Sequence, residues 1–266
     1  MSAGIDKAVI LAAGLGNRIS AVSKTTAKPL LPIDGPGGTT TFLDWHLESL
    51  HAIGVREIYI VGNKVTHGTK LRAMQSVKAE WISNPTDDLS TSGSAHSAWF
   101  AWSSAHGILD GTSRVVLMDA DIVYEPALLD ELARAGGERS KTFVCASFRE
   151  TQEEVVVYGD PPRFHGKGLT SALVGGAASI GEATGIVLFE PQDHALVREV
   201  TDWLMRFSTA KTRSEHEDIT QRLMLLDRMS AVCFGGERLF MEVDTPDEYE
   251  VLVTQMWPKL ARLARR

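Results

Sequence analysis

The chain has 266 residues, of which 44% are hydrophobic and 23% are charged, and it carries a formal net charge of −7 at pH 7. These proportions are ordinary for a soluble globular protein, and the length can bury one sizeable core, so we expect a single domain over residues 1–266. The acidic balance argues against a general nucleic-acid binder, although an acidic protein still binds an anionic nucleotide when its cations gather in one cleft.

Apolar runs and cysteines bear on where the protein acts. No apolar run approaches the ~18 residues of a membrane-spanning helix, so no membrane partner is expected. The N-terminus has no long apolar segment after a basic start, which favours a cytoplasmic protein without a signal peptide. Cys145 and Cys233 lie in apolar stretches far apart in the sequence, and this favours free thiols over a disulfide.

The first half of the chain alternates between strand and helix patterns. This order predicts crossover units and a mainly parallel sheet, in which ligands bind at the carboxyl ends of the strands. Gly14, Asn84 and Asp119 each come just after a predicted strand. Strands are expected at 8–13, 55–61, 79–82, 114–118 and 142–147, and helices at 41–50, 70–75, 93–105 and 126–135.

The second half is less regular. The two halves together predict an α/β fold, with a Rossmann-like, mostly parallel sheet flanked by helices and a small antiparallel excursion in the second half. Short antiparallel strands are expected at 155–158, 163–165 and 169–170, further strands at 183–189, 231–234 and 239–243, and helices at 194–206, 216–227 and 245–257.

The first predicted strand ends in a glycine-containing turn. Gly14 and Gly16 stand two apart, which lets the backbone turn sharply and expose N–H groups to a polyphosphate. Arg18 and Lys28 add two cations just beyond the turn. A Gly-x-Gly alone is more often an ordinary strand–loop–helix corner, so the phosphate interpretation depends on the longer string.

Two acidic pairs follow later strands. Asp119 and Asp121 come after one buried strand, and Glu242 and Asp244 come after another. Alternate residues of an extended segment point the same way, so each pair can present two carboxylates to one site. Such hard oxygen ligands suit Mg²⁺. Either pair alone could equally cap a helix, but two pairs downstream of a phosphate loop favour a metal site.

The string Leu-Ala-Ala-Gly-x-Gly-x-Arg at 11–18, followed by Lys-Pro-Leu-Leu-Pro at 28–32, resembles the signature of the nucleotidyltransferase superfamily. Its members include sugar-1-phosphate nucleotidyltransferases and the choline-phosphate or phosphonate cytidylyltransferases of bacteria. The resemblance implies a nucleotide-diphospho-sugar transferase-like fold, with a loop that wraps the triphosphate and with Arg18 and Lys28 neutralising it. Ala21 and Ala27 stand where the family often has proline, a departure that affects loop stiffness and not charge.

The resemblance also implies roles for the acidic pairs. In this superfamily an aspartate after the central strand and an acidic residue late in the chain hold the catalytic Mg²⁺. Asp121 and Asp244 are therefore the expected direct ligands, with Glu242 beside them and Asp119 as the alternative to Asp121. The late segment at 242–249 looks like that of choline-phosphate-type cytidylyltransferases.

Two other segments resemble family sites for the base and the acceptor. Asn84 and the serine-rich run at 90–95 look like the base-recognition region, in which Ser92 and Ser94 would bond the pyrimidine edge. Backbone contacts would come from Leu11 and Ala13. An ordinary serine-rich helix cap is the competing interpretation.

The segment at 181–186 resembles a Gly-Glu-x-x-Gly stretch that lines acceptor pockets, so Glu182 is the expected acceptor contact. Lys167 could steady the acceptor phosphate or be a solvated loop lysine. A solvated helix face is the preferred interpretation of Glu217 and Asp218.

These features predict a Mg²⁺-dependent nucleotidyltransferase that joins an NTP, with CTP favoured, to a small phosphorylated or phosphonate acceptor and releases pyrophosphate. The histidines show no metal-ligand spacing and no Ser/His/Asp arrangement stands out, so the acceptor itself is the expected nucleophile. A sugar-1-phosphate uridylyl-, thymidylyl- or guanylyltransferase, a non-catalytic nucleotide-sensing subunit and a glycosyltransferase are the alternatives. The acceptor, the pathway and a homo-oligomeric state are left open.

Overall fold

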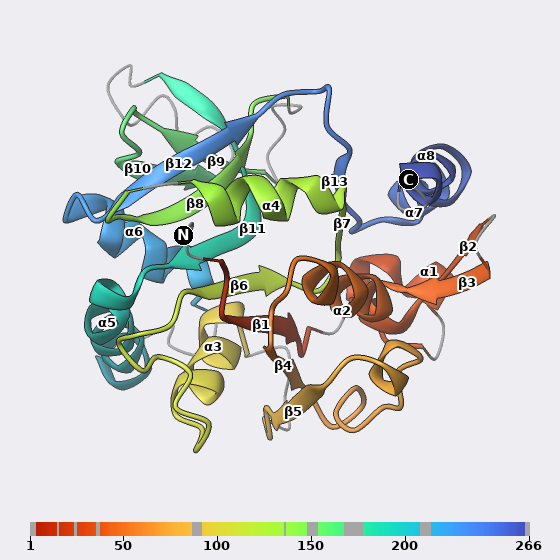
Figure 1. Ribbon diagram of the computed structural model, residues 1–266, viewed down its shortest axis with the longest axis horizontal. Helices are drawn as coiled ribbons and strands as arrows, with labels where there is room; N and C mark the ends of the chain where they lie inside the picture. The colour runs from red at the N-terminus through yellow and green to blue at the C-terminus, as the bar shows by residue number, and fades with distance from the viewer. Residues whose placement is uncertain are drawn as a thin grey trace.

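A nine-stranded sheet runs through the centre of the computed structural model (Figure 1). The structure describes residues 4–14, 16–23, 26–35, 38–86, 92–135, 137–147, 154–167, 178–207 and 214–263. The main path of the sheet is β10-β9-β11-β6-β1-β4-β5, and β8 pairs with β11 and β12. The strands are β1 (Lys7–Ala12), β4 (Glu57–Gly62), β5 (Ala79–Ser83), β6 (Val115–Asp119), β8 (Ser140–Cys145), β9 (Val155–Tyr158), β10 (Phe164–Lys167), β11 (Ser179–Phe189) and β12 (Met229–Phe234).

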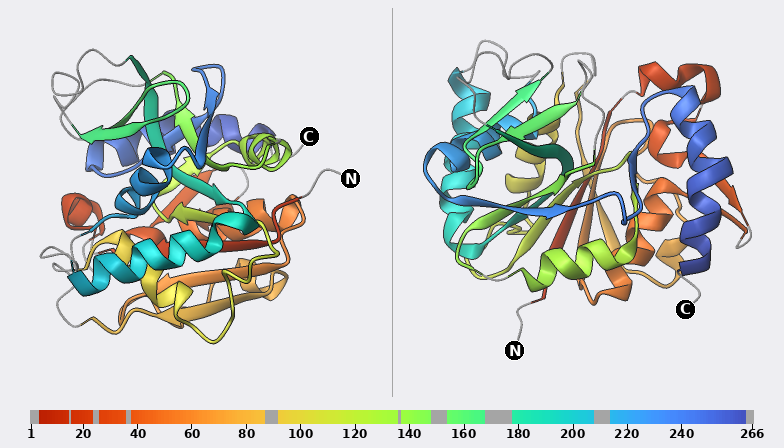
Figure 2. Two further views of the ribbon diagram at one scale, coloured as in Figure 1. Left: turned by 90° about the vertical axis from the view of Figure 1, so that its left-hand side faces the viewer. Right: turned by 90° about the horizontal axis from the view of Figure 1, so that it is seen from above.

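Helices cover both faces of this sheet (Figure 2). Ile10 of β1 belongs to a core cluster with α2 (Phe42–Ala52) and α4 (Pro126–Arg134). Val9 and Leu11 belong to another cluster with helices on the other face. Because side chains alternate along a strand, β1 reads as one continuous apolar run when both faces are covered. The helices of the second cluster are α3 (Ser94–Trp102), α5 (His194–Phe207) and α6 (His216–Leu225).

The order of the strands adds a feature that the sequence did not predict. The strands β5, β4, β1 and β6 pair in parallel as predicted, but β11 lies antiparallel between β6 and β8. The sequence predicted strands at 142–147 and 183–189 but not their places in the sheet. The apolar end of β11, buried from Thr184 to Phe189, takes this central place. The prediction of an α/β fold with a mostly parallel sheet and an antiparallel excursion is confirmed.

A two-stranded sheet joins the middle of the chain to its C-terminal part. β7 (Ile122–Tyr124) and β13 (Phe240–Glu242) pair antiparallel, with Ile122 opposite Glu242. The N–H of Val243 donates to the carbonyl of Asp121 at 3.0 Å. This pairing brings the two acidic segments together. A strand was predicted at 239–243, whereas β7 was not predicted.

Other elements agree with the sequence except in detail. The helix expected at 70–75 is only a short turn, η3 (Ala73–Gln75), and the strand expected at 169–170 lies outside the described residues. The last helix is longer than expected, because α7 (Pro246–Val251) continues through η8 (Leu252–Met256) into α8 (Trp257–Leu263). A hairpin of β2 (Pro32–Gly35) and β3 (Gly38–Thr41) was not predicted. Cys145 and Cys233 are free thiols.

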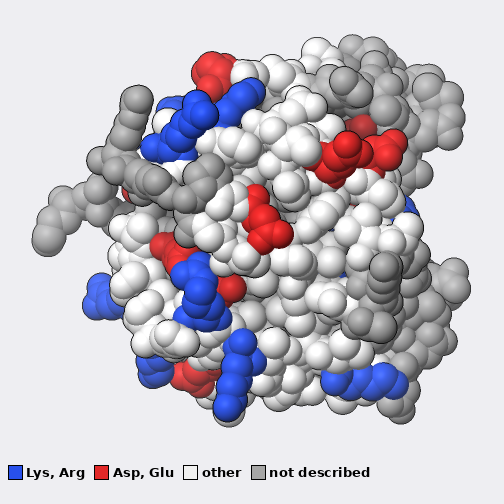
Figure 3. All heavy atoms as spheres, turned by 90° about the vertical axis from the view of Figure 1, so that its right-hand side faces the viewer, with Lys and Arg blue, Asp and Glu red and all other residues white. Residues whose placement is uncertain are grey.

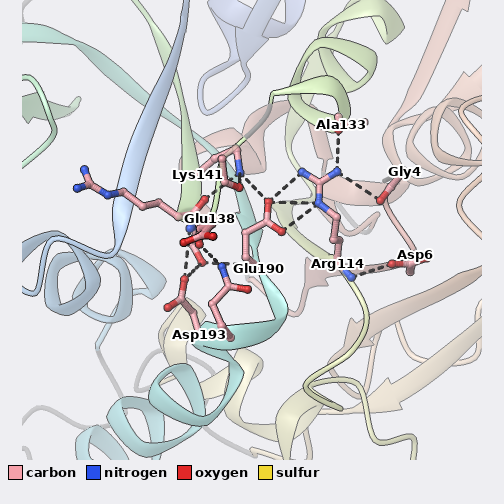
Figure 4. Close-up of polar contacts among 12 residues, drawn as sticks. Gly4, Asp6, Arg114, Ala133, Glu138, Lys141, Glu190 and Asp193 are labelled. Carbon is pink, nitrogen blue, oxygen red and sulfur yellow. Dashed lines mark hydrogen bonds and ion pairs between the residues drawn. The ribbon is translucent and has the colours of Figure 1, made fainter. Parts of the chain in front are cut away.

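A buried ionic network closes the end of the sheet where β11 finishes (Figure 4). Glu190, just after β11, accepts from Arg114 Nη2 at 2.9 Å and from Lys141 Nζ at 2.6 Å. Arg114 also donates to the carbonyl of Ala133 at 2.7 Å, and Lys141 donates to that of Arg139 at 2.8 Å. The Glu190 carboxylate thus pairs with two buried cations, and both cations make further hydrogen bonds. Buried charges are tolerated when they are paired and hydrogen-bonded in this way.

The surface shown in Figure 3 carries scattered charges of both signs rather than a continuous basic patch. Among the described residues, no helix is long and apolar enough to cross a membrane.

Candidate functional site

A cleft of about 1180 Å³ lies at the carboxyl ends of β1 and β6. Most of the predicted site residues, which come from distant parts of the chain, line this cleft, whereas Asn84 does not. The selected residues that line it are Leu11, Ala13, Gly14, Gly16, Arg18, Lys28, Ser92, Ser94, Asp119, Asp121, Glu182, Glu242 and Asp244.

The glycine turn after β1 is braced from the neighbouring strand. Asn63, at the end of β4, donates from Nδ2 to the carbonyl of Ala13 at 2.9 Å, and Thr66 donates to that of Ala12 at 3.1 Å. These contacts hold the carbonyls of the loop and leave its other side facing the cleft. Asn63 was not among the predicted site residues. Its position at the end of the strand next to β1 was the available signal.

Lys28 is buried in the wall of the cleft. Its Nζ donates to Asp121 Oδ2 at 2.7 Å and to Asp244 Oδ1 at 2.6 Å. Burial opposes the charged form, but the attraction and hydrogen bonds of the two aspartates outweigh it and raise the pKa of Lys28. Arg18 Nη2 lies 2.8 Å from Asp244 Oδ2. The two predicted phosphate-binding cations therefore meet the predicted metal-binding carboxylates.

Three carboxylates form a compact group. Asp121, Glu242 and Asp244 each offer an oxygen, and these oxygens lie within 4.8 Å of one another. Although Glu242 is exposed, desolvation by the surrounding atoms raises its pKa well above the usual range, and the neighbouring Asp121 and Asp244 raise it further. A group of hard oxygen donors whose negative charges repel one another fits a divalent cation such as Mg²⁺.

Asp244 is held in place by its own helix start. Glu248 Oε2 accepts from the backbone N–H of Asp244 at 2.7 Å and from that of Thr245 at 2.8 Å. Thr245 caps α7 in return, because its side chain accepts from the N–H of Glu248. This capping box explains the sequence of the segment and fixes the turn that carries Asp244.

Asp119 lies apart from the three-carboxylate group. Its Oδ1 is 3.9 Å from His216 Nδ1, at the start of α6. A Cβ on Gly185 would stand 2.4 Å from Asp119 Oδ2, so only glycine fits opposite this carboxyl. Burial raises the pKa of Asp119, and Asp121 and Glu217 add to the effect. The geometry thus groups Asp121, and not Asp119, with Glu242 and Asp244.

Asn84 has a different place from the one expected. It is fully buried, and its Nδ2 donates to Ser92 Oγ at 3.0 Å and to Ser97 Oγ at 3.1 Å. Asn84 therefore positions two hydroxyls of the cleft wall instead of lining the cleft itself. Ser97 lines the cleft and was missed, because it falls inside a predicted helix.

Ser94 begins α3 and connects it to α6. Its N–H and Oγ both donate to Glu215 Oε2, at 2.8 and 2.6 Å. The cap position itself is Gly93, which contributes no side-chain hydrogen bond. Of the serine-rich run, residues 90 and 91 lie outside the described residues.

Most of the charged side chains that line the cleft are acidic. Burial raises the pKa of Glu182 to about 7, with further contributions from Glu154 and Glu248. Of the described Lys and Arg side chains, only Arg18 and Lys28 line the cleft. The lining carboxylates are Asp119, Asp121, Glu154, Glu182, Glu215, Glu217, Asp218, Glu242, Asp244, Asp247 and Glu248.

Glu217 and Asp218 therefore face the cleft, contrary to the solvated helix face that the sequence favoured. Lys167 ends β10, where its backbone pairs with Val155. The position of the Lys167 side chain lies outside the described part of the structure.

A parallel-stranded α/β fold with a glycine turn, two cations and a carboxylate group at the strand ends defines a nucleotide-binding transferase domain. Residues 8–184 match the profile of the MobA-like NTP transferase domain, and the chain belongs to that family. The resemblance drawn from the loop is thereby confirmed.

Known proteins resemble this chain in sequence and in fold. Over 132 residues, which are 48% of this chain and 19% of the relative, it is 33% identical to CMP-5'-(3-aminopropyl)phosphonate synthase of Streptomyces rubellomurinus. The match thus spans about a fifth of that relative's length.

Two solved structures share the fold. The inositol-1-phosphate CTP transferase of T. maritima has a TM-score of 0.74 and 15% identity, and the match covers 99% of this chain and 98% of the other. The CTP:phosphocholine cytidylyltransferase of Streptococcus pneumoniae has a TM-score of 0.66 and 16% identity, with coverage of 94% and 98%.

Proposed function

We propose that the protein transfers a cytidylyl group from CTP to a small phosphorylated or phosphonate acceptor, in a Mg²⁺-dependent reaction that releases pyrophosphate. One observation carries this proposal: the loop cations Arg18 and Lys28 and the carboxylates Asp121, Glu242 and Asp244 meet in one cleft. A site that only binds nucleotide has no need of three clustered metal-ligating carboxylates.

The reaction needs no nucleophile from the protein. An oxygen of the acceptor phosphate or phosphonate forms a bond to the α-phosphorus of CTP, and the bond from that phosphorus to the bridging oxygen of pyrophosphate breaks. The amides of Gly14 and Gly16, with Arg18 and Lys28, hold the leaving phosphates and neutralise their charge. Asp121, Glu242 and Asp244 would hold Mg²⁺, which supplies further neutralisation of phosphate charge when bound.

The choice of CTP and acceptor is supported by the similar proteins. The Streptomyces relative is named for a CMP-aminopropylphosphonate product, and the two solved structures are named for CTP-dependent reactions. The many carboxylates that line the cleft, Glu182 among them, agree with an acceptor that carries an amine in addition to its phosphonate or phosphate.

Pyrophosphate release tests the proposal. The purified protein is incubated with each of the four NTPs and a panel of acceptors: aminoalkyl phosphonates, their amine-free analogues, phosphorylated alcohols and sugar 1-phosphates. We expect release with CTP and an amine-bearing acceptor, loss of release with EDTA, and a CMP adduct of the acceptor by mass spectrometry. Release with sugar 1-phosphates instead would move the protein to the sugar nucleotidyltransferases, and no release with any pair would favour a binding-only role.

A further inference from the structure

The two basic side chains of the cleft are bound to the carboxylates assigned to the metal. Lys28 Nζ lies between Asp121 Oδ2 and Asp244 Oδ1, at 2.7 and 2.6 Å, and Arg18 contacts the other oxygen of Asp244 at 2.8 Å. The Lys28 side chain is only 6% exposed. The ammonium therefore occupies oxygens that a divalent cation would need, and its charge would repel such a cation.

The backbone that carries Lys28 is fixed. Lys28 begins the short helix η2 (Lys28–Leu30), with Pro29 buried behind it. Gly16 packs against the base of the Lys28 side chain, because a Cβ there would come within 2.7 Å of Lys28 Cβ. Only the outer part of the side chain is left to move. A lysine stem has several rotatable bonds, so its ammonium can turn from the carboxylates to the neighbouring glycine turn.

Lys28 lies between the proposed sites of two different ligands. Asp121 and Asp244 would serve the metal, whereas the amides of Gly14 and Gly16 would serve the phosphates. A triphosphate in the turn offers Lys28 new anionic oxygens, and the aspartates are then released to a divalent cation. Each ligand improves the site for the other, and such coupling is reciprocal.

We propose that the Lys28 ammonium competes with divalent metal for Asp121 and Asp244 in the nucleotide-free protein, and that a bound triphosphate ends this competition by accepting Lys28. Metal and nucleotide then bind cooperatively through one lysine. The inference deepens the proposed function, because it assumes that the same cleft holds the nucleotide and the metal.

Titration with Mn²⁺ as the metal probe tests the competition. Binding of Mn²⁺ alone is measured by electron paramagnetic resonance for the wild type and for Lys28→Met. We expect the variant to bind about tenfold more tightly, the size of a lost charge-assisted contact. In the presence of CTP without acceptor the order reverses, and the wild type retains more Mn²⁺ than Lys28→Met. If Lys28 had only a structural role, adding CTP would not invert the order of the Mn²⁺ affinities of the wild type and Lys28→Met.

Controls separate the outcomes. Lys28→Arg keeps the charge and should bind Mn²⁺ like the wild type, and Lys78→Met changes a lysine whose side chain is 84% exposed. If Lys28→Met does not fold, reductive methylation of the wild type reports on the same exchange, with Mn²⁺ increasing the labelling of Lys28 relative to Lys78.

Equal or weaker Mn²⁺ binding by a folded Lys28→Met, or labelling unchanged by Mn²⁺, overturns the inference. Failure of the proposed function is a separate result, because it shows as no pyrophosphate release whatever Lys28 does to Mn²⁺ binding.

Discussion

Gly16 packs directly against Lys28: a Cβ built on the glycine would stand 2.7 Å from Lys28 Cβ. Gly16 also has a φ of +62°, a conformation that costs other residues about 1 kcal/mol or more. We expect Gly16→Ala to destabilise the fold by at least that amount and to displace Lys28, so that kcat/KM for CTP falls by about tenfold or more. Denaturant unfolding and steady-state kinetics measure the two effects.

Gly14→Ala is the matched control. Apart from the chain neighbours, no atom of the described residues would lie within 4 Å of a Cβ at Gly14, so this change adds a methyl group to open space in the same turn. Equal losses for the two variants would show that the contact with Lys28 does not matter.

Lys28 is the second residue to test. Lys28→Ala removes the buried cation between Asp121 and Asp244, and we expect a loss of about a hundredfold or more in kcat, the scale of one transition-state donor. Asp244→Ala should cause a loss of similar size, because it removes a carboxylate of the compact group. Near-normal turnover by both variants in a pyrophosphate-release assay would make the site assignment wrong.

The residues predicted for the site meet in one cleft, whereas the contacts that position them were not predicted. Gly16, Lys28 and Asp121 follow strands or turns whose local pattern is visible, and a parallel sheet brings strand ends together. The pairing of β7 with β13 was not visible, because β7 has three residues and its partner lies far along the chain.

Packing between distant parts of the chain also explains where the structure departs from the sequence predictions. The central place of β11 depends on which apolar strand is buried best, and no local pattern encodes that. Asn84 was predicted to contact the base, because its segment resembles the base-recognition region of the superfamily. Its amide instead turns inward to the hydroxyls of Ser92 and Ser97, which only the packing of α3 on the sheet could reveal.

The buried ionic network around Glu190 allows a prediction about stability that does not depend on the function of the cleft (Figure 4). Glu190→Gln keeps the shape of the side chain but leaves Arg114 and Lys141 without their buried carboxylate. We expect a loss of about 3–5 kcal/mol in the free energy of unfolding. Chemical denaturation measures it, with Glu199→Gln on the exposed side of α5 as the control. A loss no larger than that of the control would show that this network is dispensable.

Glu248 is expected to act through Asp244. Glu248→Ala removes the acceptor of two backbone N–H groups, which should cost about 1 kcal/mol of stability and weaken Mn²⁺ binding by loosening the turn. Glu248→Gln retains an acceptor oxygen and should restore much of both properties. Glu250→Ala, an exposed position on the same helix, is the control. Mn²⁺ affinity unchanged in Glu248→Ala would limit the capping box to a structural role.

The raised pKa of Glu182 predicts that the stability of the folded protein depends on pH. Burial, with Glu154 and Glu248, raises its pKa from 4.5 to about 7, so the folded protein holds this proton more tightly than the unfolded chain does. The resulting stabilisation is fully present below pH 4.5 and is lost as the pH rises through 7. Glu182→Gln should therefore remove this part of the pH dependence and be more stable than the wild type above pH 7, as measured by thermal unfolding across pH 4–8.

The same ionisation should control acceptor binding. Above pH 7 the Glu182 carboxylate is charged and attracts an ammonium group, so the KM for an aminoalkyl phosphonate should fall between pH 6 and 8. An amine-free phosphonate should show no such fall, and Glu182→Gln should remove it for the amine. If the KM of both acceptors follows the same pH profile in the wild type and in Glu182→Gln, Glu182 does not contact the amine. The cleft must then recognise the acceptor through another carboxylate, for which Glu217→Gln is the next variant to measure.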